Sequence, residues 1–163
     1  TRETVPLASV CVPLVNLAVG VVLLLAVHLL LGGRLSWALL GMPVVFGIQF
    51  VLTAGLALLF SCGHVMHRDV GNLVTVGLLF CFYASPVFYP LEMVRAAQFF
   101  PGWVTPLYML NPMAGLLTAY RRILFDGQFP GLLCLWPALA AALVLAAGLV
   151  VFRRNAPTFS DYL

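Results

Sequence analysis

The polar run over residues 64–69 is the part of the chain whose side chains best fit metal or catalytic chemistry. His64 and His67 lie three residues apart, so on a helix they share one face, and Asp69 follows two residues later. The helix of a zinc protease needs the motif HExxH. Here Val65 occupies the position of the glutamate that acts as general base. The string His-Arg-Asp also occurs in kinase catalytic loops, yet neither DFG nor a glycine-rich loop accompanies it. We therefore expect a polar cluster between two apolar segments rather than a metal site.

The sequence has no motif for binding ATP and none for acid–base catalysis. The pattern GxxxxGK[ST] is absent, so any ATP-driven work would need a separate partner. No Ser-His-Asp pattern stands out, and the four cysteines lack CxxC spacing, which favours buried thiols that behave as small hydrophobes. The acidic residues lie at the ends of apolar segments or in loops, which argues against ion-driven transport: Glu3, Asp69, Glu92, Asp126 and Asp161. We expect a protein that is not an enzyme and needs no cofactor.

The composition places the chain in a membrane. Of its 163 residues, 63% are hydrophobic and only 8% are charged, and the mean hydropathy is +1.10. A soluble domain carries roughly 25% charged residues, so soluble globular and disordered proteins are excluded. The net charge of +3 is too small and too spread out to indicate binding to nucleic acid.

Four apolar segments are long enough to cross a membrane as helices, because about 20 helical residues span the hydrocarbon core. They are Val5–Leu31, Leu35–Gly63, Val70–Leu91 and Gly131–Phe152, and a tail over 153–163 follows them. Within the last segment, Ala138, Ala142 and Ala146 recur every four residues, which predicts a stripe for close helix packing. The predicted fold is an all-α polytopic membrane protein that forms a single transmembrane domain over 1–163.

The region over 92–130 has a different pattern. Asn111-Pro112 is typical of an N-cap followed by proline at the first helical position, and Gly127 suits a C-terminal cap after Asp126. A helix from Pro112 to about Phe125 would be too short to cross. This pattern predicts a re-entrant or interfacial hairpin, which a membrane tolerates only where protein or water satisfies its backbone. An ordinary surface loop with two amphipathic turns is the alternative.

Orientation does not follow from charge. With four spans, one side would hold Arg2, Arg68, Arg153 and Arg154, and the other side would hold Arg34, Arg95, Arg121 and Arg122. The positive-inside rule therefore gives a tie.

Several blocks, in this order, resemble a known family. Arg68–Val74 reads RDVGNLV, Phe82–Val94 reads FYASPVFYPLEMV, Leu107–Phe125 reads LYMLNPMAGLLTAYRRILF, and Phe152–Leu163 reads FRRNAPTFSDYL. With the opening TRETVPLA, this succession resembles the C-terminal part of type-2 ABC exporter permeases, which move bacterial cell-surface polysaccharides such as O-antigen, capsule and teichoic acid. The resemblance covers essentially the whole chain.

The resemblance implies a permease of six spans, of which this chain would lack an N-terminal interfacial helix and the first two spans. It implies a multi-pass protein of the bacterial cytoplasmic (inner) membrane that works as a homodimer with an ATP-binding subunit, in contact with membrane lipid and a glycan substrate. It also implies that the Arg34 turn and the hairpin face outward, while 64–69 and the tail face the cytoplasm. The alternatives are a related ABC permease for drugs or lipids and a non-transporting membrane scaffold or truncated remnant.

Two groups of candidate site residues follow from the resemblance. Near the cytoplasm, a short loop would contact the ATPase subunit through polar residues: Arg2, Glu3, His67, Arg68 and Asp69. Near the hairpin, aromatic rings are either an interfacial belt or a lining on which sugars stack. Arg121 and Arg122 either snorkel at a helix end or attract lipid phosphates or anionic sugar. The candidate pathway residues are Tyr83, Phe88, Tyr89, Trp103, Tyr108, Asn111, Arg121 and Arg122.

Overall fold

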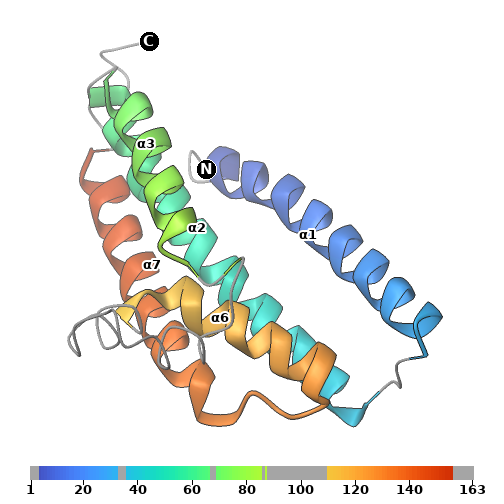
Figure 1. Cartoon of the computed structure of the whole chain (residues 1–163). Coiled ribbons are helices and arrows are strands. Elements are labelled where there is room, and N and C mark those ends of the chain that lie inside the picture. Colours follow the sequence, from blue (N-terminus) through green and yellow to red (C-terminus); the bar gives the residue numbers. More distant parts are fainter. Residues whose placement is uncertain (1–3, 33–35, 67–68, 86, 88–109, 156–163) are drawn as a thin grey trace, which may run out of the picture.

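The computed structural model of the chain describes residues 4–32, 36–66, 69–85, 87 and 110–155, and every element in these ranges is helical. The predicted all-α class is therefore confirmed. In chain order the elements are α1 (Thr4–Leu30), a 3-10 turn η1 (Trp37–Gly41), α2 (Met42–Met66), α3 (Val70–Tyr83), α6 (Pro112–Arg121), a π turn η2 (Arg122–Asp126), a 3-10 turn η3 (Gly131–Cys134) and α7 (Leu135–Asn155) (Figure 1).

Helices α2 and α7 form the centre of the protein, and their backbones touch where they cross. A Cβ atom placed on Gly55 would lie 2.6 Å from the backbone nitrogen of Leu145, and one on Gly148 would lie 2.7 Å from the carbonyl oxygen of Gly55. Only residues without a side chain permit this approach. Beyond the crossing, toward the C-terminal end of α2, Leu58 packs with Cys62 and Phe152 in a small buried cluster.

The predicted alanine stripe on the last span does not form the contact between α7 and α2. Ala142 and Ala146 are exposed, and the side of α7 that faces α2 carries Ala141, Gly148 and Phe152 instead. The physical reason is that glycine lets two helices approach more closely than alanine does. The pair Gly55 and Gly148 therefore fixes which face of α7 is turned inward.

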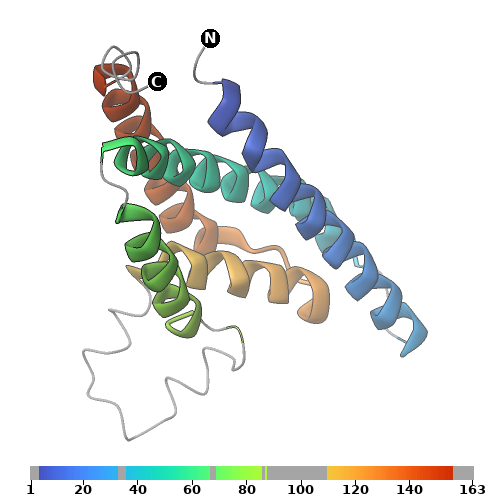
Figure 2. The ribbon, with the colours of Figure 1, turned by 90° about the horizontal axis from the view of Figure 1, so that it is seen from above.

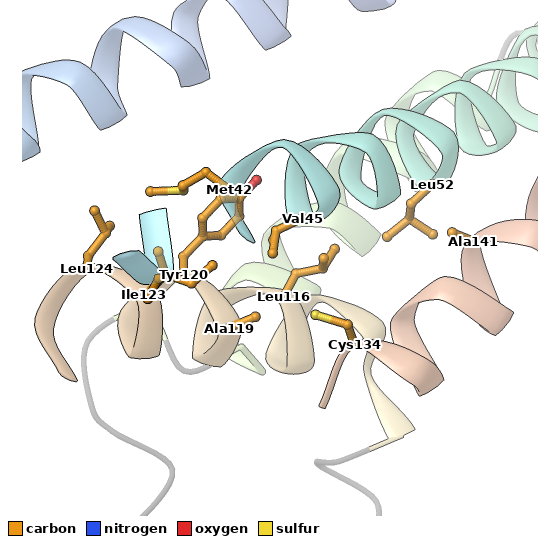
Figure 3. Close-up of a cluster of buried hydrophobic side chains, with 11 residues drawn as sticks. Met42, Val45, Leu52, Leu116, Ala119, Tyr120, Ile123, Leu124, Cys134 and Ala141 are labelled. Atoms are coloured by element: carbon orange, nitrogen blue, oxygen red, sulfur yellow. The ribbon is translucent and has the colours of Figure 1, made fainter. Parts of the chain in front are cut away.

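Helix α6 lies against the first half of α2 and the start of α7, and it supplies much of the main core (Figure 3). Leu116, Ala119 and Ile123 are fully buried beneath Met42 and Val45 of α2. Gly115 lies so close to Pro137 that an added Cβ would be 2.6 Å from its Cγ. Helix α6 is therefore seated firmly in the α2–α7 body.

Among the described residues, three helical stretches are long and apolar enough to cross a membrane: Val10–Leu30, Trp37–His64 and Gly131–Asn155. They correspond to three of the four predicted spans. The first of them, in α1, lies on the side of α2 away from α7 (Figures 1 and 2). Val21 and Leu25 of α1 pack against the main core, whereas most of the other side chains of this stretch are exposed.

The count of four spans is not confirmed. The segment predicted to run over 70–91 forms α3, which ends at Tyr83 after 14 residues. At about 1.5 Å per residue it is roughly 21 Å long, against about 30 Å of hydrocarbon. The helix ends there because Ser85 precedes Pro86, and the residue before a proline is disfavoured in the α conformation. Residues 88–91 lie outside the described residues.

Candidate functional site

The start of α6 is capped as the sequence predicted. The Oδ1 atom of Asn111 accepts a hydrogen bond of 3.0 Å from the backbone nitrogen of Met113, and Pro112 occupies the first helical position. The Asn111 backbone is extended, as expected for an N-cap residue. The cap satisfies an amide that would otherwise have no partner within the helix.

The helical segment that begins with α6 ends where it was predicted, at Gly127. Its last part is a π turn that the sequence did not reveal. Helix α6 continues into η2, and Gly127 then adopts a left-handed conformation with φ of +61° and donates its N–H to the carbonyl of Arg122. The hydroxyl of Ser36 donates a 2.9 Å hydrogen bond to the Gly127 carbonyl. This bond ties the end of α6 to the residue that caps η1.

The centre of the candidate site is a set of hydrogen bonds between α6 and the residues that follow α3. The Nδ2 atom of Asn111 donates to the Ser85 hydroxyl at 3.0 Å, and that hydroxyl donates to the carbonyl of Cys81 at 2.7 Å. From the other end of α6, Nη2 of Arg121 donates to the carbonyl of Val87 at 2.8 Å. The two sequence blocks SPVFYP and LNP therefore meet in the fold.

Burial strengthens these bonds. Only 4% of Ser85 is exposed, so its hydroxyl depends on protein partners rather than on water. The bond from Arg121 involves an ionised donor, and charge-assisted hydrogen bonds are roughly twice as strong as neutral ones. Together, Asn111 and Arg121 hold the chain at the point where α3 has ended.

Arg121 and Arg122 have different environments. Arg121 was expected either to snorkel or to attract anions. In the structure its guanidinium donates a hydrogen bond to the backbone carbonyl of Val87. Arg122 is partly exposed, and its own carbonyl accepts hydrogen bonds from Gly127 and Gln128.

Tyr83 is the one predicted aromatic pathway residue within the described residues. It is 63% exposed, and its ring meets that of Phe82 edge-on with centroids 5.6 Å apart. The ring of Phe80, three residues earlier on α3, is exposed as well. The other predicted aromatics lie outside the described residues: Phe88, Tyr89, Trp103 and Tyr108.

Only one of the predicted ATPase contacts is described. Asp69 is exposed and directly precedes α3, where its carbonyl accepts the N–H of Leu73 at 3.1 Å. Nearby, α2 and α3 approach closely, since a Cβ on Gly63 would lie 3.0 Å from Val70 and one on Gly71 would lie 3.1 Å from His64. Arg2, Glu3, His67 and Arg68 lie outside the described residues.

Sequence reasoning missed two members of the site. Ser85 was part of a recognised block, but nothing local indicated that its partner is Asn111. The other is Trp136, whose indole nitrogen donates to the carbonyl of Leu110 at 2.9 Å and so ties the start of α7 to the chain before α6. One signal could have suggested the pairing of Ser85 with Asn111. In each of two apolar segments, a polar residue directly precedes a proline.

The site can hold backbone in a defined conformation, but its hydroxyl, amide and guanidinium groups form no nucleophile–base pair among the described residues. One polar atom nearby has no hydrogen-bond partner in the described structure: the hydroxyl of Tyr120, which is buried on α6 beside Phe46. The arrangement therefore suits positioning rather than bond-breaking chemistry.

Comparisons with known proteins agree with this picture. A sequence model of the family described as "ABC-2 type transporter" matches residues 3–125. The chain is similar to the "O-antigen export system permease protein RfbA" of Myxococcus xanthus, with 27% identity over 162 residues that cover 98% of this chain and 60% of the relative. A Klebsiella pneumoniae protein with the same description is 24% identical over 166 residues, covering 99% of this chain and 61% of the relative. The chain thus spans about three fifths of the length of these relatives. No solved structure gives a significant match.

Proposed function

Because the chain belongs to the ABC-2 type transporter family, we propose that it is part of the membrane-spanning permease of an ATP-driven exporter of cell-surface polysaccharide or lipid-linked glycan. The observation that carries this proposal is the similarity, along 98% of the chain, to a protein described as an O-antigen export permease. The substrate and the partners below are part of the proposal.

The proposed partners are a separate ATP-binding subunit and a second copy of the permease. The need for the first is supported by the absence of a P-loop motif from these 163 residues. The proposed location is the bacterial cytoplasmic membrane, where the protein contacts lipid and the glycan. The three long apolar helices support a multi-pass membrane protein.

The proposed arrangement has four spans and a re-entrant hairpin, with the Arg34 turn and residues 92–130 outside and residues 64–69 and the tail inside. Helix α6 and its π turn are together only about 20 Å long, which is too short to cross. Backbone groups at membrane depth must be satisfied by protein. The Asn111 cap and the Ser36–Gly127 bond provide such partners at the two ends of α6.

The proposed substrate pathway runs past the start of α6. The N-terminus of a helix carries a partial positive charge, and broken helices in transporters commonly direct such ends at the substrate route. Tyr83, on the exposed end of α3, leads into the segment that Asn111 holds. The remaining members of the proposed pathway are Phe88, Tyr89, Trp103, Tyr108, Arg121 and Arg122.

Export should depend on the aromatic rings of this pathway and not on their hydroxyl groups. We expect deletion of the full-length gene to abolish surface polysaccharide. Supplying the gene with Tyr83→Phe, Tyr89→Phe or Tyr108→Phe should restore it fully. The matching alanine variants should restore it several-fold more slowly, because a stacked ring contributes on the order of 1 kcal/mol. Surface glycan is measured at matched membrane levels of protein. Equal export by the alanine and phenylalanine sets would assign these tyrosines to an interfacial belt.

The proposed contact with the ATPase subunit is the short loop before α3, together with the residues before α1. The exposed position of Asp69 at the start of α3 supports this role. Arg2, Glu3, His67 and Arg68 complete the proposed contact.

Replacing Arg68 and Asp69 together with alanine in the full-length permease should lower substrate-stimulated ATPase activity and leave membrane insertion intact, because the change removes polar contacts without touching an apolar span. The ATPase rate is measured in reconstituted complexes. Asn72→Ala is the matched control, since Asn72 is also exposed on the first turn of α3, and it should keep the wild-type rate. Normal stimulation in the double variant would show that this loop does not couple the two subunits.

A further inference from the structure

Helix α3 is attached to the rest of the described structure differently from α2, α6 and α7. None of its residues is buried, and Phe80 is 74% exposed. Core packing therefore does not fix its position. Helix α6, by contrast, buries Leu116, Ala119 and Tyr120 in the core.

The attachments of α3 lie at its two ends. At the Asp69 end, Gly63 and Gly71 allow α2 and α3 to meet closely. At the other end, the Ser85 hydroxyl and the Val87 carbonyl are bonded to Asn111 and Arg121. Val87 also donates its N–H to the Ser85 carbonyl at 2.7 Å, so the two bonded residues are tied into one turn.

We propose that Ser85, Asn111 and Arg121 form a latch by which the fixed helix α6 holds the far end of the loosely packed helix α3. While the latch is closed, the end of α3 that carries Tyr83 stays attached to α6 through Ser85. When the latch opens, that end of α3 moves away from α6 together with Tyr83. This inference rests on the proposed function, because it makes Ser85, Asn111 and Arg121 positioning residues for the pathway rather than groups that bind the glycan.

The exposed position of Asp69 indicates where a force that opens the latch would act. A helix transmits a displacement along its axis, and the near end of α3 is the exposed Asp69. A force applied at Asp69 therefore displaces α3 about its close contact with Gly63. The hydrogen bonds at Ser85 oppose this displacement at the other end of the helix. The hydrogen bonds from Asn111 and Arg121 can break and re-form in each cycle, whereas the buried packing of α6 cannot.

The first test measures the latch without any substrate. Hydrogen exchange is followed at the amides of Ala84, Ser85 and Val87 in the full-length permease, embedded in membrane and bound to its ATPase. Weakening the attachment should speed exchange at these amides about tenfold in Ser85→Ala and in Arg121→Gln, while the melting temperature of the protein stays at the wild-type value. The readout needs no glycan, so it stands even if the proposed substrate is wrong.

Arg122→Gln is the matched control for this test. It removes a neighbouring guanidinium that makes no hydrogen bond within the described residues, so exchange at the three amides should not change. Equal exchange in Arg121→Gln and Arg122→Gln would overturn the latch. So would a fall in melting temperature that matches the rise in exchange, because that result would make these bonds part of the general stability of the fold.

The second test locks the latch. The Ser85 and Asn111 side chains already meet at 3.0 Å, so Ser85→Cys with Asn111→Cys, in a chain whose four native cysteines are replaced, is joined by a short thiosulfonate linker. Joining should stop export, and reduction should restore it, which also shows that the variant is folded. Export at the same rate in the joined and reduced states would overturn the proposal. If reduction restores no export, the hydrogen-exchange result decides.

Discussion

Replacing Gly55 with alanine is expected to force α2 and α7 apart and to destabilise the protein strongly. The new Cβ would lie 2.6 to 2.8 Å from backbone atoms of Val144 and Leu145, which cannot rotate away as a side chain can. Overpacking of a core by side chains costs about 1–3 kcal/mol, and a clash with backbone belongs at or above the top of that range. The measurement is the melting temperature of the purified protein, followed by tryptophan fluorescence.

Gly47→Ala is the matched control on the same helix. A Cβ on Gly47 would meet nothing within 4 Å, so this change should leave the protein as stable or stabilise it by up to about 1 kcal/mol through better helix propensity. Similar melting temperatures for the Gly55 and Gly47 variants would show that the backbones of α2 and α7 are not in contact. Gly148→Ala, on the other side of the crossing, should behave as Gly55→Ala does.

Tyr120 should give opposite results for two substitutions. Its ring packs edge-on against Phe46 with centroids 5.8 Å apart, while its buried hydroxyl has no hydrogen-bond partner among the described residues. Tyr120→Ala removes the ring from the core and should cost about 3–5 kcal/mol. Tyr120→Phe keeps the ring and removes an unsatisfied polar group, which should stabilise the protein by about 1–3 kcal/mol.

Melting temperatures of the three proteins provide the check. The expected order is phenylalanine above tyrosine above alanine. A lower melting temperature for Tyr120→Phe than for the wild type would show that the hydroxyl is bonded in the folded protein.

The features that were predicted correctly from sequence depend on neighbours along the chain. Asn111 caps α6 because its own side chain reaches the amide two residues on, and Gly127 ends the helix because glycine adopts positive φ at little cost. The long apolar helices followed from composition and length alone. In each case the residues that decide the structure lie within a few positions of one another.

The features that were missed depend on partners far away in sequence. The face of α7 that packs inward is chosen by Gly55, which no pattern within α7 can reveal. In the candidate site, Asn111 was identified as a cap, but its second bond to Ser85 crosses from one block to another. The same holds for Arg121, whose two predicted roles were argued from its place at a helix end, whereas its observed partner is the carbonyl of Val87.

The contact between Gly55 and Gly148 also has a consequence for how the protein is made. Membrane helices insert first and associate afterwards, and chains emerge from the ribosome N-terminus first. Helix α2 therefore waits in the lipid, with the Gly55 surface uncovered, until the last described helix has been synthesised. Helix α6 waits as well, because Pro137 of α7 forms part of its seat. Until α7 arrives, neither the Gly55 surface of α2 nor the Gly115 surface of α6 has its partner, so the assembly of these helices depends on α7.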